Sequence, residues 1–141
     1  MRLSSHFTLK ELTFSQTAQR HDLYNTPNGE QFGNIQLLCY TILEPVRKFF
    51  DLPFSPSSGY RCLELNRLIG SKDTSQHLEG RAVDFEIPGI PNKDVADWID
   101  ENLSYDQLIL EYYDPEVINS GWIHVSYQNL LQNRRHYFGI S

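Results

Sequence analysis

The sequence lacks the features that mark several large classes of protein. It has only two cysteines among 141 residues, too few for a disulfide framework. It has no apolar run close to the ~20 residues of a membrane span, and its first twelve residues contain no apolar core of a secretory signal. Basic residues are scarce, since 12 of them against 18 acidic residues give a net charge of −6. We therefore do not expect a protein that binds nucleic acid through phosphate contacts.

The composition is that of a globular domain. Forty per cent of the residues are hydrophobic and 21% are charged, which excludes a wholly disordered chain. A chain of 141 residues can bury one core without disulfides or structural metals. No repeat, low-complexity tract or linker interrupts it, so we expect a single domain over residues 1–141, monomeric, with both cysteines reduced.

Four segments show signals of helices. The sequence Thr8-Leu-Lys-Glu11 fits a capping box at the start of a short helix. Residues 30–50 carry apolar side chains at helical spacing, and Pro45 predicts a kink or a restart within them. Shorter helices are expected over residues 62–69 and 92–103.

Three segments alternate as strands do, over residues 82–87, 107–112 and 122–127. Turn residues between the last two predict a hairpin. This order of elements predicts an α+β fold, in which helices pack on one face of a small antiparallel sheet. The basic tail at 133–137 is expected to be a solvated terminus.

Polar side chains gather on the other face of these strands. Asp84, Glu111 and His124 each alternate with apolar residues in a different strand, and His77 precedes Asp84 by seven residues. Two imidazoles and one carboxylate form a three-ligand zinc set whose fourth position stays open for water, as in catalytic sites. Neither cysteine has a partner at zinc-finger spacing, so a cysteine-type zinc site is not expected.

The segments around these residues resemble a known family. They are Ser58-Gly-Tyr-Arg61, Ser75-Gln-His-Leu-Glu-Gly-Arg-Ala-Val-Asp84 and Trp122-Ile-His-Val-Ser126. Together they resemble the zinc D-alanyl-D-alanine carboxypeptidases, a family that includes vancomycin-resistance dipeptidases and phage L-alanyl-D-glutamate endolysins. The wider superfamily contains the hedgehog signalling domain. The similarity covers residues 5–127, and the chain most resembles the short phage and prophage members.

The resemblance implies roles for matching residues. The positions that match zinc ligands are His77, Asp84 and His124. Arg61 matches an arginine that contacts a carbonyl or carboxylate oxygen of the substrate, and Ser75 matches a serine near the substrate. We expect Arg61 to serve the substrate rather than the fold. Tyr60 and Trp122 flank the motifs, where they either line a substrate groove or pack against the sheet.

The implied function is a zinc metallopeptidase, encoded by a phage or prophage, that hydrolyses an amide bond in peptidoglycan stem peptides as a carboxypeptidase or endopeptidase. One alternative is a non-catalytic zinc module that binds cell wall or a partner protein. Another is a zinc peptidase that acts on proteins or D-amino-acid dipeptides. Without a signal peptide, we expect synthesis in the cytoplasm and action at the cell wall after release or within a phage particle.

One position departs from the family pattern. Many relatives carry an acidic general base three residues before the last histidine ligand, where this chain has Gly121. We predict that Glu111 replaces this base, because the expected hairpin places it opposite Gly121 and Trp122, where it would fill the space that glycine leaves. Glu116 in the turn and Glu86 further along its strand are weaker candidates.

Overall fold

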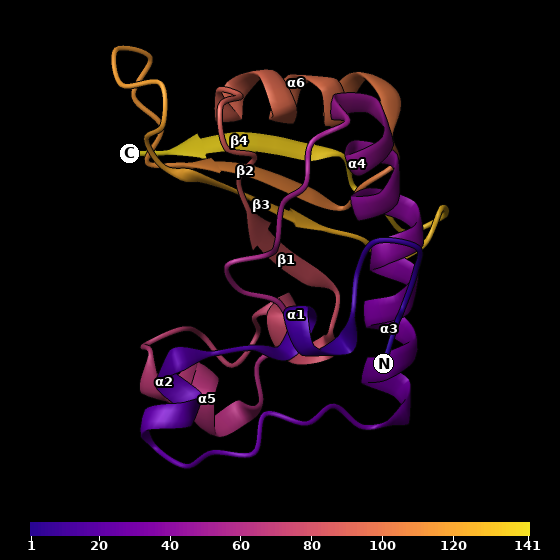
Figure 1. The fold of residues 1–141 in the computed structure, drawn as a ribbon, viewed down its shortest axis with the longest axis vertical. Coiled ribbons are helices and arrows are strands. Elements are labelled where there is room, and N and C mark those ends of the chain that lie inside the picture. The colour runs from indigo at the N-terminus through magenta and orange to yellow at the C-terminus, as the bar shows by residue number, and fades with distance from the viewer.

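The computed structural model describes residues 1–141, and their order of elements confirms the α+β fold class (Figure 1). The elements are α1 (Leu9–Thr13), α2 (Gln16–Arg20), α3 (Gly29–Leu38), the π-helical segment η1 (Cys39–Leu43), α4 (Glu44–Phe50), α5 (Leu63–Leu68), the 3₁₀ segment η2 (Gln76–Glu79), β1 (Ala82–Phe85), α6 (Asn92–Asn102), β2 (Gln107–Glu111), β3 (Trp122–Ser126) and β4 (His136–Ile140).

The four strands form one sheet in the order β1-β3-β2-β4. β3 pairs antiparallel with β1 and with β2, which confirms the expected hairpin, whereas β4 pairs parallel with β2. This fourth strand was not predicted, and the expectation of a solvated tail over residues 133–137 is only partly right: Arg134, Arg135 and His136 are exposed, but the segment leads into β4 and is tied to the fold. The tail is held because Arg134 hydrogen-bonds the buried carboxylate of Asp106, and β4 then adds to the free edge of β2.

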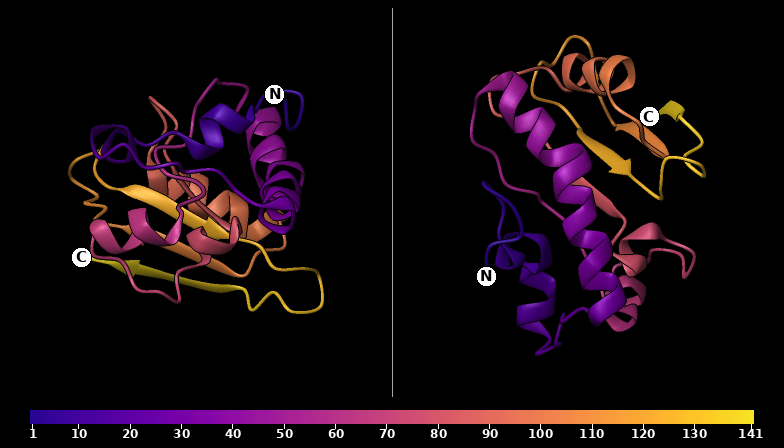
Figure 2. Two further views of the ribbon diagram at one scale, coloured as in Figure 1. Left: turned by 90° about the horizontal axis from the view of Figure 1, so that it is seen from below. Right: turned by 90° about the vertical axis from the view of Figure 1, so that its right-hand side faces the viewer.

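The helical rod of α3, η1 and α4 and the helix α6 cover one face of the sheet, whereas α1, α2 and α5 lie beyond β1 (Figures 1 and 2). Figures 1 and 2 show the long helical rod of α3, η1 and α4 crossing the sheet. The helix α6 lies next to the α4 end of this rod, at the top of Figure 1. Their apolar side chains join those of the strands in a core of 22 buried residues, which includes Leu38, Val95, Leu108 and Val125. No helix combines the length and apolar character needed to cross a membrane.

The long rod contains a π-helical turn where the sequence predicts an interruption. The backbone N–H of Glu44 donates to the carbonyl of Cys39, five residues earlier instead of four. The next residue, Pro45, has no N–H and occupies the first turn of α4, where a missing donor costs least. The sequence predicts a kink or a restart near Pro45, and the structure has an interruption there in the form of a π-helical turn within one helical rod.

Candidate metal centre and cleft

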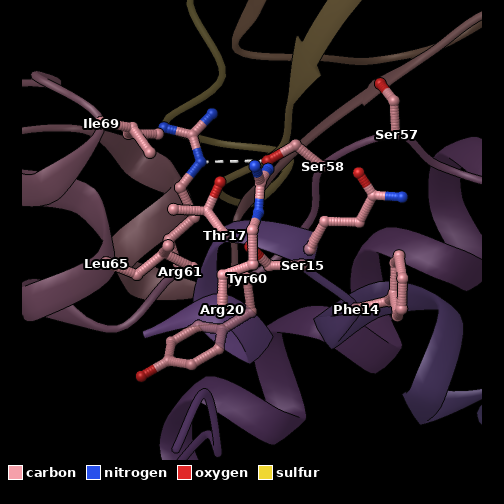
Figure 3. A pocket seen from close by; sticks show the side chains of 11 residues that line it. Phe14, Ser15, Thr17, Arg20, Ser57, Ser58, Tyr60, Arg61, Leu65 and Ile69 are labelled. Carbon is pink, nitrogen blue, oxygen red and sulfur yellow. Dashed lines mark hydrogen bonds between the residues drawn. The ribbon is translucent and has the colours of Figure 1, made fainter. Parts of the chain in front are cut away.

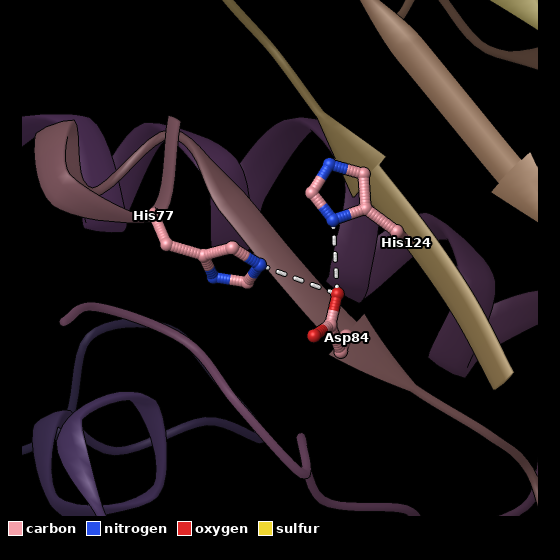
Figure 4. A group of neighbouring side chains, drawn as sticks. All are labelled: His77, Asp84 and His124. Atoms are coloured by element: carbon pink, nitrogen blue, oxygen red, sulfur yellow. Dashed lines mark hydrogen bonds and ion pairs between the residues drawn. The ribbon is translucent and has the colours of Figure 1, made fainter. Parts of the chain in front are cut away.

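Three candidate ligands meet on the sheet face that the rod and α6 leave uncovered (Figure 4). Asp84 in β1 lies directly opposite His124 in β3, and η2 brings in His77. Asp84 Oδ1 is 2.9 Å from His124 Nδ1 and 3.3 Å from His77 Nε2. One ligand atom from each residue lies within 4.8 Å of the others, so the three can hold a single metal ion.

The hydrogen bonding of the site favours a cation between these atoms. His77 Nδ1 lies 2.7 Å from the Gly59 carbonyl, which can only accept, so the proton sits on Nδ1 and Nε2 presents its lone pair. A lone pair and a carboxylate therefore face each other, an arrangement that a bound metal satisfies. Two nitrogens and one oxygen form a donor set that suits zinc.

The loop before α5 fixes the second edge of the site. The Ser58 carbonyl accepts from the Asp84 N–H at 2.7 Å, and the Arg61 N–H donates to the His77 carbonyl at 3.2 Å. Between them, Gly59 lies so close to α1 that a Cβ there would be 2.3 Å from the Leu12 carbonyl oxygen. The Ser-Gly-Tyr-Arg segment thus needs glycine for close packing, and the loop ties both ligand-bearing segments together.

Arg61 is held more firmly than the sequence suggests. Its Nε donates to Ser58 Oγ at 3.0 Å, its Nη1 to Asn66 Oδ1 at 3.1 Å and its Nη2 to Asp84 Oδ2 at 3.4 Å. Only 12% of the side chain is exposed, and this burial lowers the pKa of the guanidinium despite the nearby Asp84 and Glu111 carboxylates. The expectation that Arg61 contributes nothing to the fold needs correction, because it joins three segments.

Glu111 lies on the same sheet face as the metal ligands. It pairs with Trp122 across the hairpin, two residues along from the pair of Ile109 and His124. Side chains that oppose each other on antiparallel strands point to the same face. Glu111 therefore lines the cleft that contains His124, whereas Glu86 and Glu116 are exposed outside it.

We expected Glu111 to fill an empty space beside Gly121, but no such space exists. Gly121 has a φ of +68°, and a Cβ built there would be 2.0 Å from the backbone oxygen of Glu111 and 2.7 Å from the carbonyl carbon of Tyr112. The neighbouring backbone occupies this volume. No side chain, acidic or otherwise, fits at the position where relatives carry their base.

The remaining predicted residues are divided between the cleft and the core. The cleft has a volume of about 1220 Å³ and includes Ser75 and Trp122 in its walls. Ser75 also caps η2, because its Oγ accepts from the His77 N–H at 3.3 Å. Tyr60 is only 6% exposed and belongs to the core cluster, so it is not part of the cleft wall, but it contributes to the wall of a neighbouring pocket.

Sequence reasoning missed the C-terminal wall of the cleft. Asp106 is fully buried, and its carboxylate accepts from Arg134 Nε at 2.9 Å, from Arg134 Nη2 at 2.8 Å and from Gln76 Nε2 at 2.8 Å. The hydrogen bonds from Arg134 lower the pKa of Asp106 well below its usual range. Because Gln76 precedes His77, this carboxylate links the C-terminal segment to the loop that carries a metal ligand.

The comparison with protein-family models agrees with this geometry. A model described as Peptidase M15 matches residues 5–126, which include the three candidate ligands, Arg61 and Glu111 and exclude β4. No curated protein matches the chain. The family match covers most of the chain and all of the predicted site. The chain therefore belongs to the M15 peptidase family, the family of zinc D-alanyl-D-alanine carboxypeptidases and endolysins.

Proposed function

We propose that this protein is a zinc peptidase that hydrolyses an amide bond in the stem peptides of peptidoglycan. The observation that carries the proposal is the cluster of His77, Asp84 and His124, which opens onto a cleft large enough for a peptide and lies within an M15 family match. Zinc held there would act as a Lewis acid toward the scissile carbonyl and lower the pKa of a coordinated water.

The chain's own residues supply the other roles. Glu111, on the face that holds the ligands, accepts the proton of the attacking water. Arg61 keeps part of its guanidinium open to the cleft and donates to the oxygen that gains negative charge. Ser75 and Trp122 line the walls and position the peptide.

The proposed place of action is the cell wall, reached after release from the cell that makes the protein or as part of a phage particle. Digestion of purified sacculi by the zinc-loaded protein, followed by mass spectrometry of the products, tests the proposal. A released terminal D-alanine would identify a carboxypeptidase, and a new internal amino terminus would identify an endopeptidase. Intact sacculi after prolonged digestion would contradict both.

A second candidate function rests on Gly121. Because no side chain fits there, the base of many relatives is absent, and the fold could hold zinc to bind wall or a partner without hydrolysis. Binding of sacculi by the zinc-loaded protein with no product in the mass spectrum would favour this alternative. Cleavage that depends on Glu111 would exclude it.

A further inference from the structure

A second pocket lies beside the metal cleft, and Arg61 lines both (Figure 3). Its volume is about 310 Å³. One part of its wall is apolar, with Phe14, Leu65 and Ile69. The polar part consists of two guanidinium groups, four aliphatic hydroxyl groups and one amide, which belong to Arg20, Arg61, Ser15, Thr17, Ser57, Ser58 and Gln16, and Tyr60 completes the wall. Figure 3 shows Arg20 and Thr17 rising from α2 toward Ser58 and Arg61.

Arg20 brings a positive charge to the pocket that no acidic side chain pairs with, whereas Arg61 pairs with Asp84 outside the pocket wall. No aspartate or glutamate lines it, and Arg20 takes part in none of the ion pairs of the chain. The carboxylate nearest to Arg61 is Asp84, which also faces the two histidines of the metal centre. Two arginines that share a pocket repel each other unless an anion lies between them. The exposed guanidinium of Arg20 and the partly open guanidinium of Arg61 therefore make this pocket suited to an anion.

The pocket's chemistry suits a carboxylate that is attached to an apolar carbon skeleton. A guanidinium presents planar paired donors that match a carboxylate, and hydroxyl groups can donate to its remaining lone pairs. The apolar part of the wall can cover the carbon atoms of an amino-acid residue, whereas an inorganic ion would leave it uncovered.

We propose that this pocket binds a free carboxylate group of the substrate peptide, and that Arg20 determines specificity for it. The proposal rests on the proposed function, because Arg61 connects the pocket to the metal cleft: its Nη2 is 3.4 Å from the metal-ligand candidate Asp84. A peptide anchored here by its carboxylate would place a neighbouring amide bond in the cleft. The substrate class is thus stem peptides with free carboxyl groups. Peptides whose carboxyl groups are amidated bind this pocket more weakly.

Calorimetric binding of two synthetic stem peptides to the zinc-loaded protein at pH 7 tests this. Both have the sequence L-Ala-γ-D-Glu-L-Lys-D-Ala-D-Ala, one with free carboxyl groups and one with every carboxyl group amidated. Every protein in this test carries Glu111→Gln, so that the peptide is not cleaved during the measurement, and the protein with this change alone is the parent. Mass spectrometry verifies that the peptide stays intact. The variants are Arg20→Ala, Arg20→Lys and the control Arg67→Ala, since Arg67 pairs with Asp73 at 2.8 Å outside both pockets.

We expect Arg20→Ala to raise the dissociation constant for the free peptide by about tenfold, which matches the loss of one charge-assisted hydrogen bond. Arg20→Lys should recover part of this loss, and Arg67→Ala should bind like the parent. The amidated peptide should bind more weakly to the parent and show no dependence on Arg20, which forms no ion pair whose loss would affect the fold.

Equal binding of the two peptides by the parent, unchanged by Arg20→Ala, would overturn the carboxylate pocket and leave the peptidase proposal intact. Arg20-dependent binding of a poly(glycerol phosphate) chain without such binding of the free peptide would also overturn it, in favour of a phosphate site. If the parent binds neither peptide, and the unmodified zinc-loaded protein leaves sacculi uncleaved, the peptidase proposal itself fails.

Discussion

The Arg61 guanidinium connects the loop before α5, α5 itself and the metal-ligand candidate Asp84 through three side-chain contacts. Replacement by alanine would leave the amide oxygen of the buried Asn66 without its donor, at a cost of about 1–3 kcal/mol. We predict that Arg61→Ala lowers both the melting temperature and kcat/KM. Thermal denaturation and peptide kinetics measure the two effects, with Arg67→Ala as a control. A normal melting temperature would mean that the contacts of Arg61 stabilise nothing.

Glu111 provides the second test at the level of single residues. Glu111→Gln keeps the shape of the side chain and removes its basicity, so we predict that zinc content and melting temperature are retained while hydrolysis falls by roughly 10²–10⁴-fold. Glu116→Gln is the matched control, because Glu116 is exposed in the turn outside the cleft. Full activity of Glu111→Gln, with a loss in Glu116→Gln, would transfer the role of base to the turn.

Both the backbone conformation of Gly121 and the atoms around it restrict position 121 to glycine. Gly121→Ala must place a Cβ against the Glu111 carbonyl, whereas Gly89→Ala, at a φ of +88°, meets no atom within 4 Å. We predict that Gly89→Ala costs about 1–2 kcal/mol through strain alone and that Gly121→Ala costs clearly more. Chemical denaturation of both variants measures the difference. Equal losses would show that the backbone around Gly121 has room to adjust.

These residues also mark what the sequence can predict about the site. The three metal-ligand candidates could be found because their type and spacing reflect the chemistry that the site needs. The alternation of β2 also placed Glu111 on the correct face. The crowding at Gly121 and the contacts of Arg61 could not be found, because both depend on backbone segments that approach each other only in the folded chain.

At the scale of elements, the strands differ in how clearly the sequence pattern predicts them. β1, β2 and β3 place apolar side chains at every second position toward the core, so their existence and the hairpin could be predicted. β4 contains Gly139 and lies half-exposed at the sheet edge, so its own pattern is weak. Its position depends on the long-range contact between Arg134 and Asp106, which local sequence patterns do not reveal.

That contact allows a prediction for β4. Asp106→Asn presents an amide to the donors of Arg134 and Gln76, so we expect a loss of about 2 kcal/mol in the free energy of unfolding. Because folding lowers the pKa of Asp106, its contribution is fully present above the ordinary aspartate pKa of about 3.9 and declines as the pH falls through the folded pKa. The stability difference between the parent and Asp106→Asn should therefore shrink in acid.

Chemical denaturation between pH 3 and pH 7 measures this difference. Asp97→Asn is a control at a half-exposed carboxylate on α6, which accepts from Lys93 and from the Tyr137 hydroxyl in β4. It should show a smaller loss, since Asp97 has more access to water than the fully buried Asp106. A constant difference at all pH values for Asp106→Asn would contradict the role of its ionised carboxylate.

At the scale of the whole molecule, metal binding should stabilise the fold. The candidate ligands join β1, β3 and η2, so a metal bound there connects segments that are distant in the sequence. A ligand that binds only the folded state at 1000 times its dissociation constant adds about 4 kcal/mol. We predict a higher melting temperature with zinc than after chelation, and no such difference in Asp84→Asn. An identical melting temperature with and without zinc would contradict binding at this site.

The account depends most on the metal centre of His77, Asp84 and His124, and the number of zinc ions per chain tests it most directly. Metal analysis of the purified, zinc-loaded protein after removal of free metal should give one zinc per chain, and His77→Ala should abolish it. A stoichiometry well below one that added zinc does not restore, or unchanged binding by the variant, would contradict the account.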